Sequence, residues 1–122
     1  MSELNHFDSD GRAIMVDVTD KSETGRAAVA KGRVRMRPAT LALIVSGNAA
    51  KGDVLGVARI AGIMAAKRAW EMIPLCHPLL LNYCGVEFSI DEENHEIEAA
   101  CSVRVTGRTG AEMEALAGAA AA

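Results

Sequence analysis

The stretch that decides the fold is EIEAACSVRVT, from Glu96 to Thr106. Apolar side chains alternate along it with polar ones, and the apolar phase holds Ile97, Ala99, Cys101, Val103 and Val105. Successive side chains of a strand point to opposite faces of a sheet, so this period of two predicts a half-buried strand. Residues 79–90 predict a second strand, and the turn at 91–94 joins the two as an antiparallel hairpin.

Residues 27–37 predict a third strand with one apolar and one basic phase. The basic phase consists of Lys31, Arg33, Arg35 and Arg37. These side chains could bind a polyphosphate, or they could form a solvated face of the strand. We favour the solvated face.

Three further segments predict helices. Pro38 opens a short helix through Val45, and Asp53 is a natural N-cap for a long helix that runs to Ile73. Thr109, followed three residues later by Glu112, forms a capping-box pattern that predicts a last helix. This helix meets no stop signal before Ala122, so we expect the chain to end inside a helix and the sheet to lack a further C-terminal strand.

The long helix carries a stripe of small residues, namely Ala58, Gly62, Ala65, Ala66 and Ala69. Their spacing of three to four places them on one face, which allows another helix or a sheet to approach closely. The same alanine-rich surface also predicts that the chain self-associates.

The length and the net charge of the chain limit the classes of protein to which it can belong. The 122 residues suit one domain over 1–122, in which we expect the polar segment 1–26 to be a loosely held arm. Thirteen basic against sixteen acidic residues give a net charge of −3, which excludes a globally basic nucleic-acid binder. Aromatic residues, at 3%, are too few for a base-stacking surface.

The cysteines and the apolar segments indicate a compartment. Three cysteines cannot all pair within the chain, no zinc-binding spacing occurs, and no apolar run is long enough to span a membrane. We therefore expect a cytoplasmic protein with no membrane partner and no structural metal.

Two loops carry residues suited to chemistry at neutral pH. His77 lies between Pro74 and Pro78, which hold it in an extended loop where it could move a proton or bind a phosphate. Lys51 lies just before the N-terminus of the long helix, where anions are favoured. The simpler interpretations are a hydrogen-bonding loop histidine and a solvated lysine.

The loop before the last helix carries a third group. Arg108 stands between Gly107 and Gly110 and suits an anion, while Glu112 and Glu114 could bind a polar heterocycle. The simpler interpretation is that both carboxylates support the start of the helix.

Six motifs, in order along the chain, carry a resemblance. They are MVDV at 15–18, KGD at 51–53, ARIAGI at 58–63, AAKR at 65–68, IPLCHPL at 73–79 and TGRTGAEMEAL at 106–116. Together they resemble the MoaC family, the cyclic pyranopterin monophosphate synthases of molybdenum cofactor biosynthesis. The resemblance covers essentially the whole chain.

The resemblance implies an α+β, ferredoxin-like fold: an antiparallel sheet with helices on one face, here without its last strand. It implies a lyase that converts 3′,8-cyclo-7,8-dihydroguanosine 5′-triphosphate to cyclic pyranopterin monophosphate and releases diphosphate. It also implies a homohexamer, a trimer of dimers, with the active site at a subunit interface. No acidic cluster demands a metal or other cofactor, although Mg²⁺ is compatible with a triphosphate substrate.

The resemblance also assigns site residues. Those that contact substrate in the family fall on Leu75, Cys76, His77, Met113 and Glu114, and the family's turn lysine falls on Lys51. We take Lys51 and His77 as catalytic, and Glu112 as a further substrate contact. The triphosphate needs cations, for which Lys67, Arg26 and Arg108 are further candidates.

One departure from the family qualifies the activity. The family continues into an Asp-x-x-Lys pair that contains its catalytic aspartate, and these 122 residues do not contain that pair. We therefore expect the chain alone to be impaired. The alternatives are a non-catalytic subunit that binds a purine triphosphate or diphosphate, and a purely structural subunit.

Overall fold

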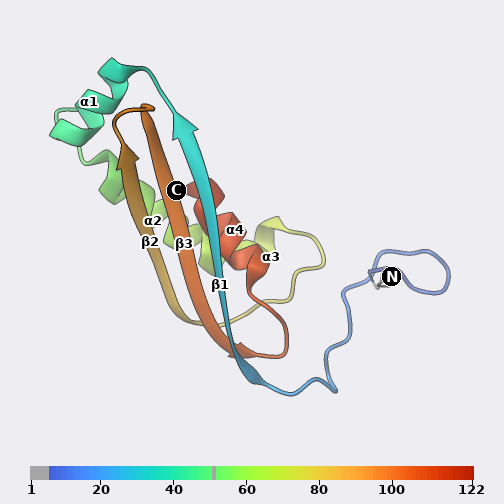
Figure 1. Cartoon of the computed structure of the whole chain (residues 1–122). Helices are drawn as coiled ribbons and strands as arrows, with labels where there is room; N and C mark the ends of the chain where they lie inside the picture. Colours follow the sequence, from blue (N-terminus) through green and yellow to red (C-terminus); the bar gives the residue numbers. More distant parts are fainter. Residues whose placement is uncertain (1–5, 51) are drawn as a thin grey trace.

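The computed structural model describes residues 6–50 and 52–122. Its elements are, in order, β1 (Thr24–Arg35), α1 (Pro38–Ser46), α2 (Val54–Lys67), α3 (Ala69–Met72), β2 (Leu81–Asp91), β3 (Glu96–Gly107) and α4 (Glu112–Ala121). The three strands lie side by side, and α2 and α4 cover one face of the sheet (Figure 1). In the described ranges no helix is long and apolar enough to cross a membrane.

β3 is the centre of the sheet, whose strand order is β1-β3-β2 with both pairings antiparallel. Every residue of its apolar phase, from Ile97 to Val105, is buried, and Cys101 lies between Ala30 of β1 and Val86 of β2. The predicted hairpin is confirmed. This order of strands, with helices on one face, is the α+β, ferredoxin-like arrangement that the resemblance implies.

The basic phase of β1 faces acidic residues of β3. Lys31 and Arg33 both pair with Glu98, at 3.8 and 3.3 Å, and Arg35 pairs with Glu96 at 2.8 Å. The three basic side chains are largely exposed, so each pair contributes little to stability. These contacts fit the solvated face rather than a polyphosphate site. The strand runs from Thr24 to Arg35, not from 27 to 37 as predicted.

The small-residue stripe packs inside the molecule. A Cβ placed on Gly62 would lie 2.9 Å from the carbonyl oxygen of Gly118 in α4 and 3.0 Å from a methyl carbon of Val86 in β2. Ala66 and Ala69 are also fully buried. The predicted close approach is therefore confirmed. Gly62, Ala66 and Ala69 are covered by the chain itself, whereas Ala58 and Ala65 are half-buried, and self-association of the chain stays a prediction.

Two helix boundaries differ from the predicted ones. The long helix begins with the predicted Asp53 cap, whose carboxylate accepts from the Gly56 amide at 2.9 Å, but ends at Lys67 instead of Ile73. The capping box is wrong: α4 begins at Glu112, with no side-chain cap. Burial of Ala111 in the core, at 2% exposure, holds Thr109 and Gly110 outside the helix.

We expect Gly118→Ala to destabilise the fold. Its new methyl group would overlap the Cys101 sulfur, and this overpacking costs about 1–3 kcal/mol, partly offset by the better helix propensity of alanine. Urea denaturation measures the change. The control is Gly32→Ala in β1, where a Cβ meets open space. Equal stability of the two variants would contradict close packing at Gly118.

Candidate active site

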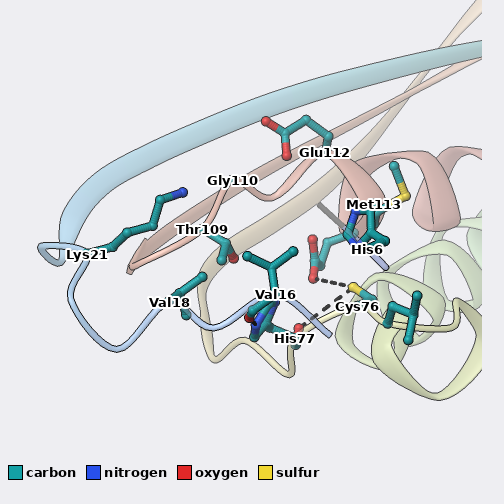
Figure 2. Close-up of a pocket in the computed structure, with 12 residues that line it drawn as sticks. His6, Val16, Val18, Lys21, Cys76, His77, Thr109, Gly110, Glu112 and Met113 are labelled. Carbon is teal, nitrogen blue, oxygen red and sulfur yellow. Dashed lines mark hydrogen bonds between the residues drawn. The ribbon is translucent and has the colours of Figure 1, made fainter. Parts of the chain in front are cut away.

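A cavity of about 270 Å³ lies between the loop after α3, the start of α4 and the N-terminal arm (Figure 2). The loop contributes Leu75, Cys76 and His77, and the connection into α4 contributes Thr109, Gly110, Glu112, Met113 and Glu114. Six residues that the sequence pointed to as substrate contacts therefore come together here: Leu75, Cys76, His77, Glu112, Met113 and Glu114. They come from segments on either side of the β2–β3 hairpin, which only the folded chain brings into contact.

Glu114 is the buried carboxyl group of the site, with only 3% of its surface exposed. Its Oε1 accepts a hydrogen bond from the Cys76 thiol at 3.6 Å, and its buried Oε2 has no hydrogen-bond partner within the described residues. Burial raises the pKa of Glu114, and the nearby Glu112 charge adds to this, whereas hydrogen bonds from its own backbone amide and from Cys76 oppose it. An unpaired buried carboxylate oxygen is costly, which makes Oε2 a natural acceptor for a bound ligand.

The loop that carries Cys76 and His77 has a constrained backbone. Leu75 adopts a φ of 65°, a left-handed conformation that costs a residue with a side chain about 1–2 kcal/mol. The Nε2 atom of His77 lies 2.5 Å from the carbonyl oxygen of Val16. A carbonyl only accepts, so Nε2 carries the proton and Nδ1 remains available. The predicted stiff loop histidine is thus tied to the arm.

The arm brings residues that the sequence analysis did not assign to the site. His6, Val16, Val18 and Lys21 also line the cavity, and Lys21 lies at the end away from Met113 in Figure 2. The apolar run MVDV at 15–18 is a signal that could have identified Val16 and Val18, because an apolar island in a polar arm needs a surface to cover. Nothing in the pattern around His6 or Lys21 sets them apart.

The remaining predicted cations lie elsewhere or outside the described part. Arg108 lines an adjoining groove that shares His77, and Arg26 donates its Nε to the carbonyl of Gly107 at 3.2 Å. Neither lines the cavity itself, nor does Lys67, which is exposed at the end of α2. Lys51 lies outside the described residues. The roles of all four stay predictions.

The cavity has the chemistry for a polar ring that carries an anionic group. A buried carboxylate oxygen can accept N–H donors, a histidine with one available ring nitrogen can move a proton, and a lysine supplies positive charge. Within residues 6–50 and 52–122 no three His, Cys, Asp or Glu side chains gather as a metal site would require.

The chain is similar to known proteins over most of its length. The sequence profile of the MoaC family matches residues 15–122. The chain is 58% identical over 116 residues to the cyclic pyranopterin monophosphate synthase of Chloroflexus aggregans, an alignment that covers 95% of this chain and 70% of that protein. The corresponding enzymes of Clostridium botulinum and Brucella ovis are 53% and 59% identical, and the alignments cover 94% and 93% of this chain and 72% and 68% of theirs.

We expect Glu114→Gln to change how stability depends on pH. Above the ordinary carboxyl value of 4.5, an unfolded Glu114 ionises while the native one, with its raised pKa, still holds its proton. Its contribution to stability is therefore complete below pH 4.5 and is lost as pH rises through the native pKa. A glutamine at this position does not ionise, so the variant does not lose stability in this way as pH rises.

Melting temperatures between pH 4.5 and 8 measure this effect. The advantage of Glu114→Gln over the wild type should grow as pH rises. Glu92→Gln, at an exposed position in the β2–β3 turn that does not line the cavity, is the matched control and should follow the wild type. A parallel pH profile for Glu114→Gln and wild type would contradict a raised pKa at Glu114.

Proposed function

Because this chain belongs to the MoaC family, we propose that it makes cyclic pyranopterin monophosphate for molybdenum cofactor biosynthesis. The substrate is 3′,8-cyclo-7,8-dihydroguanosine 5′-triphosphate and the second product is diphosphate, so the reaction is that of a lyase. The observation that carries the proposal is the cavity in which the Leu75–His77 loop meets Met113 and Glu114.

Glu114 is proposed to recognise the ring. The purine-derived base offers N–H donors along one edge, and the buried Oε2 of Glu114 has no partner within the described residues. A bound ring edge would satisfy this oxygen and favour the ionised carboxylate, whose burial is otherwise unfavourable.

The phosphate chain needs cations. Formation of the cyclic phosphate is an internal phosphoryl transfer in which diphosphate leaves, so neutralising charge on the leaving group lowers the barrier. Lys21 in the cavity lining and Arg108 in the adjoining groove support this part of the proposal. Lys51 is proposed as a catalytic cation on the family resemblance alone.

His77 is proposed to move a proton during rearrangement of the ring. Its Nε2–H is held by the Val16 carbonyl, which orients the imidazole and leaves Nδ1 to accept a proton. In this proposal the chain supplies no cofactor of its own, and Mg²⁺ arrives with the triphosphate. A cytoplasmic location is proposed on the three free cysteines, Cys76, Cys84 and Cys101, which suit a reducing compartment.

We also propose a homo-oligomer, a hexamer built from dimers, with the site at a subunit interface. A surface stripe on α2, formed by Val57, Ile60 and Met64, supports this because each of these apolar side chains is at least half exposed. Met113 at the cavity is 40% exposed and Leu80 in the adjoining groove is 92% exposed. A neighbouring subunit would cover these side chains.

Conversion of the cyclised substrate, followed by fluorescence of the oxidised product, tests the activity. In a version of the protein that also carries the family's Asp-x-x-Lys pair, we expect His77→Ala to lower turnover by about 10²–10⁴-fold, the usual contribution of a general acid or base. The matched control is His95→Ala at the β2–β3 turn, which should retain activity. Binding without product in the wild type would instead favour a binding subunit, and absence of binding would favour a structural one.

Light scattering of the Ile60→Asp variant tests the assembly. A carboxylate placed in the α2 surface stripe would be desolvated at an interface, so the variant should dissociate at micromolar concentration while the wild type remains oligomeric. Ile60→Leu keeps the apolar surface and should assemble normally. A wild-type monomer at the same concentration would contradict the proposed hexamer.

A further inference from the structure

Cys76 has the properties of a hydrogen-bond donor rather than a nucleophile. Burial raises the pKa of its thiol to about 11, and the adjacent Glu114 carboxylate adds to the rise. The sulfur therefore keeps its proton at neutral pH. Because the thiolate is the reactive form of cysteine, the Cys76 thiol is suited to hold a partner in place and not to attack a substrate.

The thiol proton has two acceptors within reach. The sulfur lies 3.6 Å from Oε1 of Glu114 and 3.7 Å from the carbonyl oxygen of its neighbour His77. Dashed lines from Cys76 mark these hydrogen bonds in Figure 2. An ionised carboxylate is the stronger acceptor of the two, since hydrogen bonds to charged groups are shorter and stronger. The single proton is therefore directed at Glu114 when that side chain is ionised.

The direction of the thiol is set by its neighbours in the chain. Leu75 before it is held in the left-handed region, and the ring of His77 after it is bonded to the Val16 carbonyl. Pro78 restricts the backbone of His77 further. Cys76 thus lies in a short loop with little freedom to rotate away from α4.

Glu114, by contrast, needs an external group to orient its carboxylate. The last torsion of a glutamate side chain is broad and two-fold, so packing alone defines the plane of the carboxylate poorly. Oε1 has the Cys76 donor, and Oε2 has no partner among the described residues. The carboxylate also receives a hydrogen bond from its own backbone amide, and Cys76 supplies the only side-chain donor to it among the described residues. The Cys76 hydrogen bond at Oε1 therefore contributes to the direction in which Oε2 points.

We propose that Cys76 is a positioning residue: its S–H donates to Oε1 of Glu114 and so presents Oε2 to the N–H edge of the bound ring. This rests on the proposed function for the identity of the ring, but not for the hydrogen bond itself. The other charged or titratable groups around Glu114 are Glu112 on its own helix, His77 on the loop, and His6 and Lys21 on the arm. Burial and the repulsion from Glu112 act against ionisation of Glu114, whereas the hydrogen bonds from its own backbone amide and from Cys76 act for it.

Three variants of the 122-residue chain test the proposal: Cys76→Ala removes the donor, Cys76→Ser replaces it with a hydroxyl, and Cys84→Ala is a control at another half-buried cysteine. The first readout is a carbon NMR titration of the Glu114 carboxyl in the free protein. Cys76→Ala should raise the pKa of Glu114 relative to wild type, and Cys76→Ser should restore it, because only the alanine variant lacks a donor.

The second readout is calorimetric affinity for GTP, a stable purine triphosphate. Loss of one oriented hydrogen bond should weaken binding by about tenfold in Cys76→Ala, while Cys76→Ser and Cys84→Ala stay within about threefold of wild type. If the pKa of Glu114 is the same in Cys76→Ala as in the wild type, the proposal is overturned. If wild type binds no GTP, the proposed function is weakened, and the titration alone still decides the role of Cys76.

Discussion

The close approach of α2 and α4 at Gly62 and Gly118 is the constraint on which the rest of the structure depends. Neither position has room for a Cβ: at Gly62 it would meet the Gly118 carbonyl and Val86, and at Gly118 it would meet the Cys101 sulfur. The two helices therefore touch backbone to backbone above the centre of the sheet. The site follows from this contact, because α4 starts with Glu112–Glu114 and α2 leads through α3 into the loop of Cys76 and His77.

The candidate site combines a packed helix, a restrained loop and the N-terminal arm. Glu114 is buried on a helix whose position is fixed by packing, and the loop opposite is restrained by the left-handed Leu75 and by the bond between His77 and Val16. In its described part, residues 6–23, the arm that supplies Val16 has two turns and an isolated bridge between Phe7 and Ala13. The buried carboxyl group of Glu114 thus lies in a cavity that the arm helps to line.

The basic side chains of the sheet differ from those near the cavity in whether acidic residues pair with them. The basic side chains of β1 are matched by Glu96 and Glu98 across the strand pair, which leaves them little to offer an anion. At the cavity the arm brings Lys21, and the adjoining groove brings Arg108. On the proposed function, the phosphate end of the substrate would be held by the arm and the groove, while the ring end is held by α4.

The sequence by itself determined the local elements and the chemistry available to them. Alternation along Glu96–Thr106 fixes which face of β3 is buried, the small-residue spacing in α2 predicts a close packing partner, and Pro74 and Pro78 define the His77 loop, because these signals act over a few residues. Only the tertiary structure decided that α4 is that partner, that Ala111 is buried and delays the helix, and that the arm reaches His77. The pairing of Cys76 with Glu114 belongs to the same class: it joins residues 38 positions apart, and such a contact depends on how the helices pack rather than on any local pattern.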